Sequence, residues 1–197
     1  MKMSTTLLAA LGLAALAVAS PAVADDKGIY LGGSFGLAQF GDSCDDVALL
    51  TGNTGGCQDK DEAWRAFAGY RFNKTVAVEL GFADLGRVTA QGAAQSVEAE
   101  RRSWDLSALF SLPITERLSA FGRLGVYLAK TSLKLVAPAG TSESGETNSG
   151  FSYGAGLGYQ LGFLGLRTEW QRWDNVGGGT TGEDTIDLFS VGVLIQF

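Results

Sequence analysis

The 197-residue chain contains no histidine, only two cysteines and three prolines, and 18% of its residues are charged. Histidine is the side chain most often used as a base near neutral pH, and it is a common zinc ligand. Its absence argues against catalysis and against zinc chemistry, so we expect neither an enzyme nor a bound metal or cofactor. Without proline enrichment or a regular glycine period, collagen and a disordered linker are also excluded.

Long hydrophobic runs are missing beyond the first 24 residues. These residues have the order of a secretory signal peptide: Lys2, then the apolar stretch Leu7–Ala19, then Ala22-Val23-Ala24. The alternative is an amino-terminal membrane anchor, which is disfavoured because the apolar stretch is shorter than a spanning helix requires. We assign residues 1–24 to a signal peptide and residues 25–197 to one mature domain, in which only strands have the pattern to cross a bilayer.

Charge and cysteine content bear on partners and compartment. The formal net charge is −6, and no basic patch suits nucleic acid. In an oxidising compartment Cys44 and Cys57 can close a loop as a disulfide, and two free thiols are the alternative. Acidic residues flank this loop: Asp42, Asp45, Asp46, Asp59, Asp61 and Glu62. Their spacing matches no EF-hand, so we interpret them as a solvated loop rather than a cation site.

Eight stretches show period-two alternation or many strand-forming residues. These predicted strands are 28–40, 62–73, 75–86, 98–112, 117–131, 149–162, 164–174 and 185–197. Tight connections lie near 73–74, 113–116 and 162–163, and long polar ones at 41–61, 87–97, 132–148 and 175–184. An even strand number, with short turns on one side and long loops on the other, is typical of an outer-membrane barrel with both termini on the short-turn side.

Each predicted strand has an apolar face and a small or charged face. A soluble lipocalin-like barrel would bury the apolar face, so alternation alone leaves the orientation open. Aromatic residues favour a membrane barrel, because they gather at both ends of the apolar faces as two girdles do. At the long-loop ends these residues are Trp64, Trp104 and Trp170, and near the short turns they are Phe72, Phe110, Tyr159 and Phe197.

With the apolar faces outward, the charged faces line the lumen. The ionisable residues there are Arg65, Arg71, Glu79, Asp105, Arg123, Arg167 and Glu169. Isolated charges in a narrow interior are costly, so we expect a ladder of arginine–carboxylate pairs in which Glu79 meets one arginine. Acid–base chemistry by these carboxylates is the weaker alternative. Tyr30, Phe67, Phe121 and Tyr127 share the lumen, which should be filled rather than open.

Two segments carry a family resemblance. Residues 77–87 (Ala-Val-Glu-Leu-Gly-Phe-Ala-Asp-Leu-Gly-Arg) resemble the third strand of the outer membrane protein A transmembrane domain, and residues 166–175 are similar to its seventh. The resemblance implies an eight-stranded antiparallel up-and-down transmembrane β-barrel over the mature chain. It also implies an interior ion pair of Glu79 and Arg167 that blocks or gates the lumen. The chain stops at Phe197, so we do not expect the periplasmic peptidoglycan-binding domain of that family or tethering to the cell wall.

The carboxyl-terminal residues indicate how the barrel is inserted. Phe197, Ile195 and Val193, at alternate positions, resemble the signal that the barrel-assembly machinery reads. We therefore expect a monomer in the bacterial outer membrane, in contact with its lipid and lipopolysaccharide, with a structural or surface-interactive role. The alternatives are a narrow ion or solute pore gated by the lumen ion pair, adhesin-like binding of a host or surface ligand by the loops, and a soluble periplasmic carrier.

Overall fold

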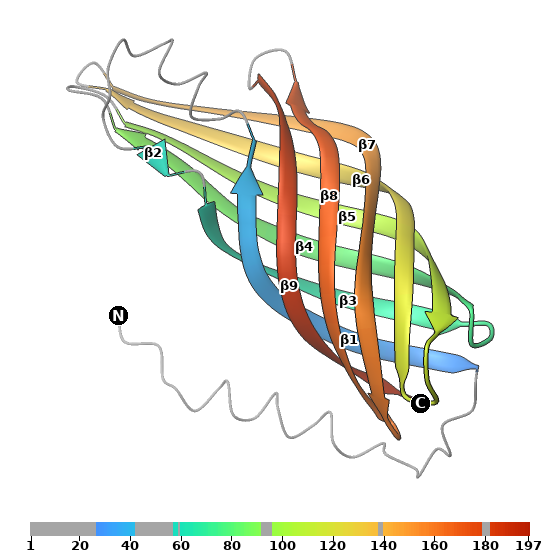
Figure 1. The fold of residues 1–197 in the computed structure, drawn as a ribbon. Coiled ribbons are helices and arrows are strands. Elements are labelled where there is room, and N and C mark those ends of the chain that lie inside the picture. Colours follow the sequence, from blue (N-terminus) through green and yellow to red (C-terminus); the bar gives the residue numbers. More distant parts are fainter. Residues whose placement is uncertain (1–26, 42–56, 59, 92–95, 138–139, 179–181) are drawn as a thin grey trace, which may run out of the picture.

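The computed structural model describes residues 27–41, 57–58, 60–91, 96–137, 140–178 and 182–197, which form one antiparallel sheet closed into a barrel (Figure 1). Its strands are β1 (Gly28–Phe40), β2 (Cys57–Gln58), β3 (Lys60–Arg71), β4 (Val76–Gln91), β5 (Ser96–Pro113), β6 (Leu118–Ala137), β7 (Gly140–Leu161), β8 (Leu164–Gly178) and β9 (Gly182–Gln196). Within the described residues, no helix is long and apolar enough to cross a membrane. The predicted signal peptide, Cys44, and the loop residues Asp42, Asp45, Asp46 and Asp59 lie outside the described residues.

Eight long strands pair in an up-and-down order that confirms the predicted fold class. Each long strand pairs with its neighbour in sequence, and β1 closes the ring by pairing with both β3 and β9. At the closure the Phe197 amide donates to the Ile29 carbonyl at 2.9 Å. The two-residue strand β2 pairs with β4 on the same side as β3, beyond the end of the β3–β4 ladder. Closure leaves the membrane-spanning part without a free sheet edge, which lipid would not tolerate.

An apolar band covers the outer surface of the barrel. On β3 it runs from Trp64 to Phe72 and on β5 from Trp104 to Leu112, about nine residues, which suits a tilted strand crossing a bilayer. At the long-loop side each strand places one polar residue directly beyond the band on the outward face. We call this ring the polar belt: Gln39, Glu62, Asp84, Arg102, Lys130, Ser149, Arg172 and Asp187. The change on all eight strands at one level marks where lipid gives way to water.

Near the polar belt two strands change register. The β4–β5 ladder shifts between Asp84 and Arg87, and the β8–β9 ladder shifts between Trp173 and Val176. A residue with positive φ lies at each shift, Gly86 at 80° and Asn175 at 56°. Such bulges bend and twist a strand, so they redirect the chain where it leaves the membrane.

Within the described residues, the segments predicted as long loops at 87–97, 132–148 and 175–184 are strand, so those predicted strand ends were wrong. Strand β6 reaches Ala137 and β7 begins at Gly140, and these two strands have 20 and 22 residues against 13 in β1. Figure 1 shows β4 to β7 running on past the ends of β1, β8 and β9. The prediction failed because a strand in water needs no lipid-facing alternation, and its Gly, Ser, Thr and Glu residues have the composition of a loop.

The lumen is filled in layers, and the inward residues of β3 pass through all of them. Ala63 belongs to an upper apolar cluster, Arg65 to a central polar layer and Phe67 to a lower apolar cluster, while Arg71 lies at the short-turn mouth. The upper cluster also contains Phe40, Leu85, Tyr127, Trp173, Val176, Ile186 and Leu188. The lower cluster consists of Tyr30, Phe67, Ala77, Leu109, Phe121 and Leu194. Side chains rather than an open channel occupy this narrow interior, as expected for eight strands.

Candidate functional site

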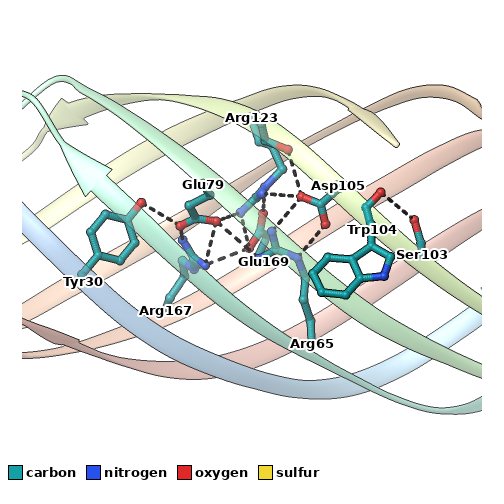
Figure 2. Close-up of polar contacts among 10 residues, drawn as sticks. Tyr30, Arg65, Glu79, Ser103, Trp104, Asp105, Arg123, Arg167 and Glu169 are labelled. Atoms are coloured by element: carbon teal, nitrogen blue, oxygen red, sulfur yellow. Dashed lines mark hydrogen bonds and ion pairs between the residues drawn. The ribbon is translucent and has the colours of Figure 1, made fainter. Parts of the chain in front are cut away.

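The central polar layer is organised around Glu79, an inward residue of β4 with no exposed surface (Figure 2). Its Oε2 lies 2.5 Å from NH2 of Arg123 and 3.3 Å from NH1 of Arg65. Its Oε1 accepts from NH1 of Arg167 at 2.6 Å and from the Tyr30 hydroxyl at 2.9 Å. One carboxylate of β4 therefore holds side chains from four other strands: β1, β3, β6 and β8.

Two further carboxylates complete this lumen cluster. Asp105 of β5 accepts from Nε and NH2 of Arg65 at 3.1 and 2.9 Å, a bidentate pair, and from the Ser107 hydroxyl at 3.1 Å. Glu169 of β8 lies 2.5 Å from Nε of Arg123 and 3.5 Å from Nε of Arg167. The contacts form a compact, branched network rather than the ladder that we predicted.

Charge is balanced within the lumen cluster. Three guanidinium groups, those of Arg65, Arg123 and Arg167, face three carboxylates, and all six side chains are buried. Burial of ions is costly, and the cost is offset only when each charge is paired and hydrogen-bonded, as here. An aromatic ring adds a cation–π contact to the cluster, since the Arg167 guanidinium lies 4.1 Å from the centre of the Phe67 ring.

A glycine on β4 makes room for these long side chains. A Cβ atom at Gly81 would overlap NH2 of Arg65 and lie 2.6 Å from Oδ1 of Asp105. Gly122 on β6 faces outward, and a Cβ atom added there would meet nothing within 4 Å. The two glycines therefore have different roles, and only Gly81 is required by the geometry of the cluster.

Arg71 was predicted in the same network, and the structure places it elsewhere. It lies at the end of β3, where NH1 donates to Oε1 of Gln196 at 2.8 Å. The reason is its position two inward residues below Phe67, which puts the lower apolar cluster between Arg71 and Glu79. Six of the seven predicted lumen residues thus meet and Arg71 does not.

A second buried ion pair and the upper apolar cluster were not predicted from the sequence. NH1 of Arg101 lies 3.4 Å from Oδ2 of Asp184, and the guanidinium lies 5.0 Å from the centre of the Phe40 ring. Trp173 is fully buried and belongs to the upper cluster. The alternation along β8 could have revealed Trp173 as a lumen residue. Trp173 lies on the same inward face as Arg167 and Glu169, but the lumen residues predicted on this strand stop at Glu169.

The predicted outer aromatic girdle lies on the lipid-facing surface. Trp64 and Trp104 are 45% and 55% exposed, and both pack on the Phe82 ring. The indole nitrogen of Trp170 donates to Oδ1 of Asp187 at 2.9 Å, directly in the polar belt. Indole rings that contact apolar residues on one side and belt carboxylates on the other are typical of a membrane interface.

Cysteine and loop predictions rest largely on residues outside the described part. The backbone of Cys57 starts β2, opposite Ala90 of β4, while its proposed disulfide partner Cys44 is not among the described residues. Of the acidic residues beside the loop, Asp61 accepts from the backbone amides of Glu62 and Arg87 at 2.9 and 2.7 Å. Its carboxylate therefore stabilises the β4 bulge.

Beyond the polar belt, parts of β2, β4, β5, β6 and β7 form a protruding sheet. Its β6–β7 ladder runs from the belt to the pair Ala137 and Gly140. In the described chain, residues 140–151 of β7 pair with β6 alone, because the β7–β8 ladder stops at Ser152 and Trp173. On the side of β8, residues 140–151 therefore have no strand ladder in the described chain, although the side-chain amide of Asn148 donates to the Asn175 carbonyl of β8.

Comparison with known proteins agrees with this geometry. The sequence profile described as the OmpA-like transmembrane domain matches residues 24–197. Two similar curated proteins are outer membrane protein A of Salmonella typhi, 28% identical, and outer membrane protein A of Klebsiella aerogenes, 29% identical; each alignment covers 98% of this chain. The chain spans 55% of the length of either relative.

Solved structures similar to this chain are outer-membrane barrels. Neisserial surface protein A superposes with a TM-score of 0.61 at 19% identity, covering 86% of this chain and 97% of that one. Ail, the attachment invasion locus protein of Yersinia pestis, superposes with a TM-score of 0.57 at 13% identity, covering 88% and 100%. That Ail structure is a complex with the heparin analogue sucrose octasulfate. At these identities the likeness establishes the shared barrel fold.

Proposed function

Because the chain belongs to the family of OmpA-like transmembrane domains, we propose that it acts as a closed barrel that holds a docking sheet above the membrane. Its place is the bacterial outer membrane, as an integral barrel with a structural or surface-interacting role. The observation that supports docking is the end of the β7–β8 ladder at Ser152, which in the described residues leaves the β7 backbone from 140 to 151 paired with β6 alone. We further propose that the protein, which has no histidine, is not an enzyme.

This edge of β7 can bind a partner that adds a strand to the protruding sheet. A free edge presents a row of backbone donors and acceptors that an extended segment of another protein can complete. In the sequence of the protruding sheet, the basic residues Arg87 and Lys134 are outnumbered by Glu98, Glu100, Glu143 and Glu146. Since this sequence is net acidic, backbone pairing rather than attraction of a polyanion is the mode of binding that we propose, in contrast to the sulfated ligand of Ail.

A proline scan of the β7 edge tests this function. Consecutive residues from Ser144 to Thr147 are replaced singly by proline, and hydrogen exchange of the parent barrel identifies which amides bond to β6. Proline at an amide that faces the free edge leaves the fold intact and removes one donor for the partner. We expect vesicles carrying these variants to lose adhesion to cultured cells. Adhesion of all variants equal to that of the parent, or a parent that adheres no better than barrel-free vesicles, would contradict the proposal.

A pore gated by Glu79 and Arg167 is the second candidate. Its support is the charged layer across the lumen, where Glu79 is held by three arginines. The upper apolar cluster lies above that layer and Trp173 fills it, so loss of the ion pair alone should not open a path. In planar bilayers we expect Glu79→Ala to show only rare openings. A steady conductance of the variant would favour the pore.

Assembly and lipid partners follow from the ends of the barrel. Val193, Ile195 and Phe197 face outward on β9, and the backbone of Phe197 joins β1. We propose that the assembly machinery reads these residues, so deletion of Phe197 should reduce the heat-modifiable folded form in cells. Unchanged migration would contradict this.

Lys130 and Arg172 of the polar belt lie at the level where lipopolysaccharide phosphates would be met, and we propose that they contact these phosphates.

A further inference from the structure

The short-turn end of the barrel opens into a cavity of about 440 Å³, which we call the vestibule. Tyr30 and Arg167 are part of its lining, and both also contact Glu79, so the vestibule ends where the lumen cluster begins. Ala77, Leu109 and Phe121 provide apolar wall. This size, with apolar walls and a few polar groups, is typical of small-molecule sites.

Charge around the vestibule is mainly positive. Arg71, Lys74 and Arg117 line it toward the mouth, against the single acidic residue Glu116. Arg167, deeper in the cavity, is neutralised by Glu79 and Glu169. The positive charge that a ligand would meet on entry therefore comes from the residues at the mouth.

Arg71 is the half-buried cation of the vestibule. Its guanidinium donates to the neutral amide oxygen of Gln196 at 2.8 Å and lies 5.6 Å from the centre of the Tyr30 ring. Among the residues that the structure describes, no carboxylate is within ion-pairing distance of it, unlike the arginines of the lumen cluster. A planar guanidinium with free donors beside an apolar wall recognises carboxylates and phosphates.

We propose that the vestibule binds a small organic anion from the periplasmic side. Its carboxylate or phosphate meets Arg71, and its apolar body lies against Leu109 and Phe121. The short turns place this mouth on the periplasmic side of an outer-membrane barrel. Phospholipid headgroups carry the same anionic chemistry, but the apolar wall inside the vestibule favours a soluble anion with an apolar body.

Nuclear magnetic resonance of the folded barrel in phosphatidylcholine nanodiscs tests this proposal. Naphthoate serves as the probe, and naphthamide is its neutral analogue of the same shape. We expect naphthoate to shift the side-chain amide of Gln196 saturably, and naphthamide to leave it nearly unchanged. Arg71→Gln should weaken the apparent affinity about tenfold, and Arg71→Lys by less, because one charge is kept but the planar donor pair is lost.

Arg102→Gln, at the opposite end of the barrel, is the matched control and should bind as the parent does. Heat-modifiable migration verifies that each variant is folded. Equal shifts with naphthamide, or equal affinity of Arg71→Gln and the parent, would overturn the proposal. So would a response of Gln196 to phosphatidylglycerol in the nanodisc with none to naphthoate, because the site would then belong to a lipid headgroup at the rim.

Discussion

Two groups of ion pairs use the same side-chain chemistry in opposite surroundings. In the lumen cluster, Glu79 and its arginines are buried and joined in one network. In the polar belt, Arg102 pairs with Asp84 at 3.3 Å while the arginine side chain is 58% exposed. Water screens the belt pairs and is excluded from the cluster, so the energetic weight of a carboxylate depends on its place in the barrel more than on its partner.

Loss of Glu79 should give the largest effect. Glu79→Ala leaves three buried arginines facing two carboxylates, and breaking such a buried pair costs about 3–5 kcal/mol. We expect the variant to unfold from lipid vesicles at much lower urea than the parent, as followed by heat-modifiable migration. Asp84→Ala in the polar belt is the matched control and should shift the midpoint slightly. Equal midpoints for the two variants would refute the distinction between cluster and belt.

A methyl group inside the cluster should have a smaller but clear effect. Gly81→Ala places a Cβ against Arg65 and Asp105, and overpacking of this kind costs about 1–3 kcal/mol. Gly122→Ala adds the same methyl group on the lipid-facing side, where nothing lies within 4 Å. Urea midpoints of the pair measure the difference, and a loss of stability in Gly122→Ala equal to that in Gly81→Ala would show that the cluster is loosely packed.

The smallest effect should come from Asp187 in the polar belt. Hydrogen bonds from Arg172, at 2.6 and 2.7 Å, and from Trp170 lower the pKa of this carboxyl below its usual value. Its stabilising contribution is thus full above the unfolded pKa of about 3.9 and is lost as the pH falls through the folded value.

Asp187→Asn should therefore be less stable than the parent at neutral pH by at most about 1 kcal/mol, since exposed pairs contribute little. The difference should begin to shrink below about pH 4 and should vanish once the pH has fallen through the lowered folded pKa, where the parent carboxyl is protonated as well. Urea titrations at several pH values measure it. A difference that persists unchanged in acid would show that the ion pair is not its source.

The parity of each membrane-spanning strand was predictable, because one face contacts lipid and the other a crowded lumen. Trp64 and Arg65 are adjacent in sequence, and they lie on opposite faces as their chemistry requires. The partners within the lumen were less accessible. Tyr30 and Glu79 are 49 residues apart and meet because β1 and β4 both flank β3, and the curvature of the barrel turns their inward side chains toward each other.

The protruding sheet was not predictable from alternation. Residues 140–151 are strand because β6 pairs with them, and no lipid contact imposes an apolar face on them. The position of Arg71 depended on strand tilt and on the depth of the lower apolar cluster, neither of which appears in the local sequence.

Quenching of single tryptophans by lipid shows directly which face of the barrel wall contacts the membrane, since the four tryptophans divide between its two surfaces. Variants that keep only Trp104, which is 55% exposed, or only Trp173, which is fully buried in the lumen, are folded into vesicles with bromine high on the acyl chains. We expect strong quenching of Trp104 and little quenching of Trp173. Quenching of Trp173 with protection of Trp104 would mean that the apolar face points inward.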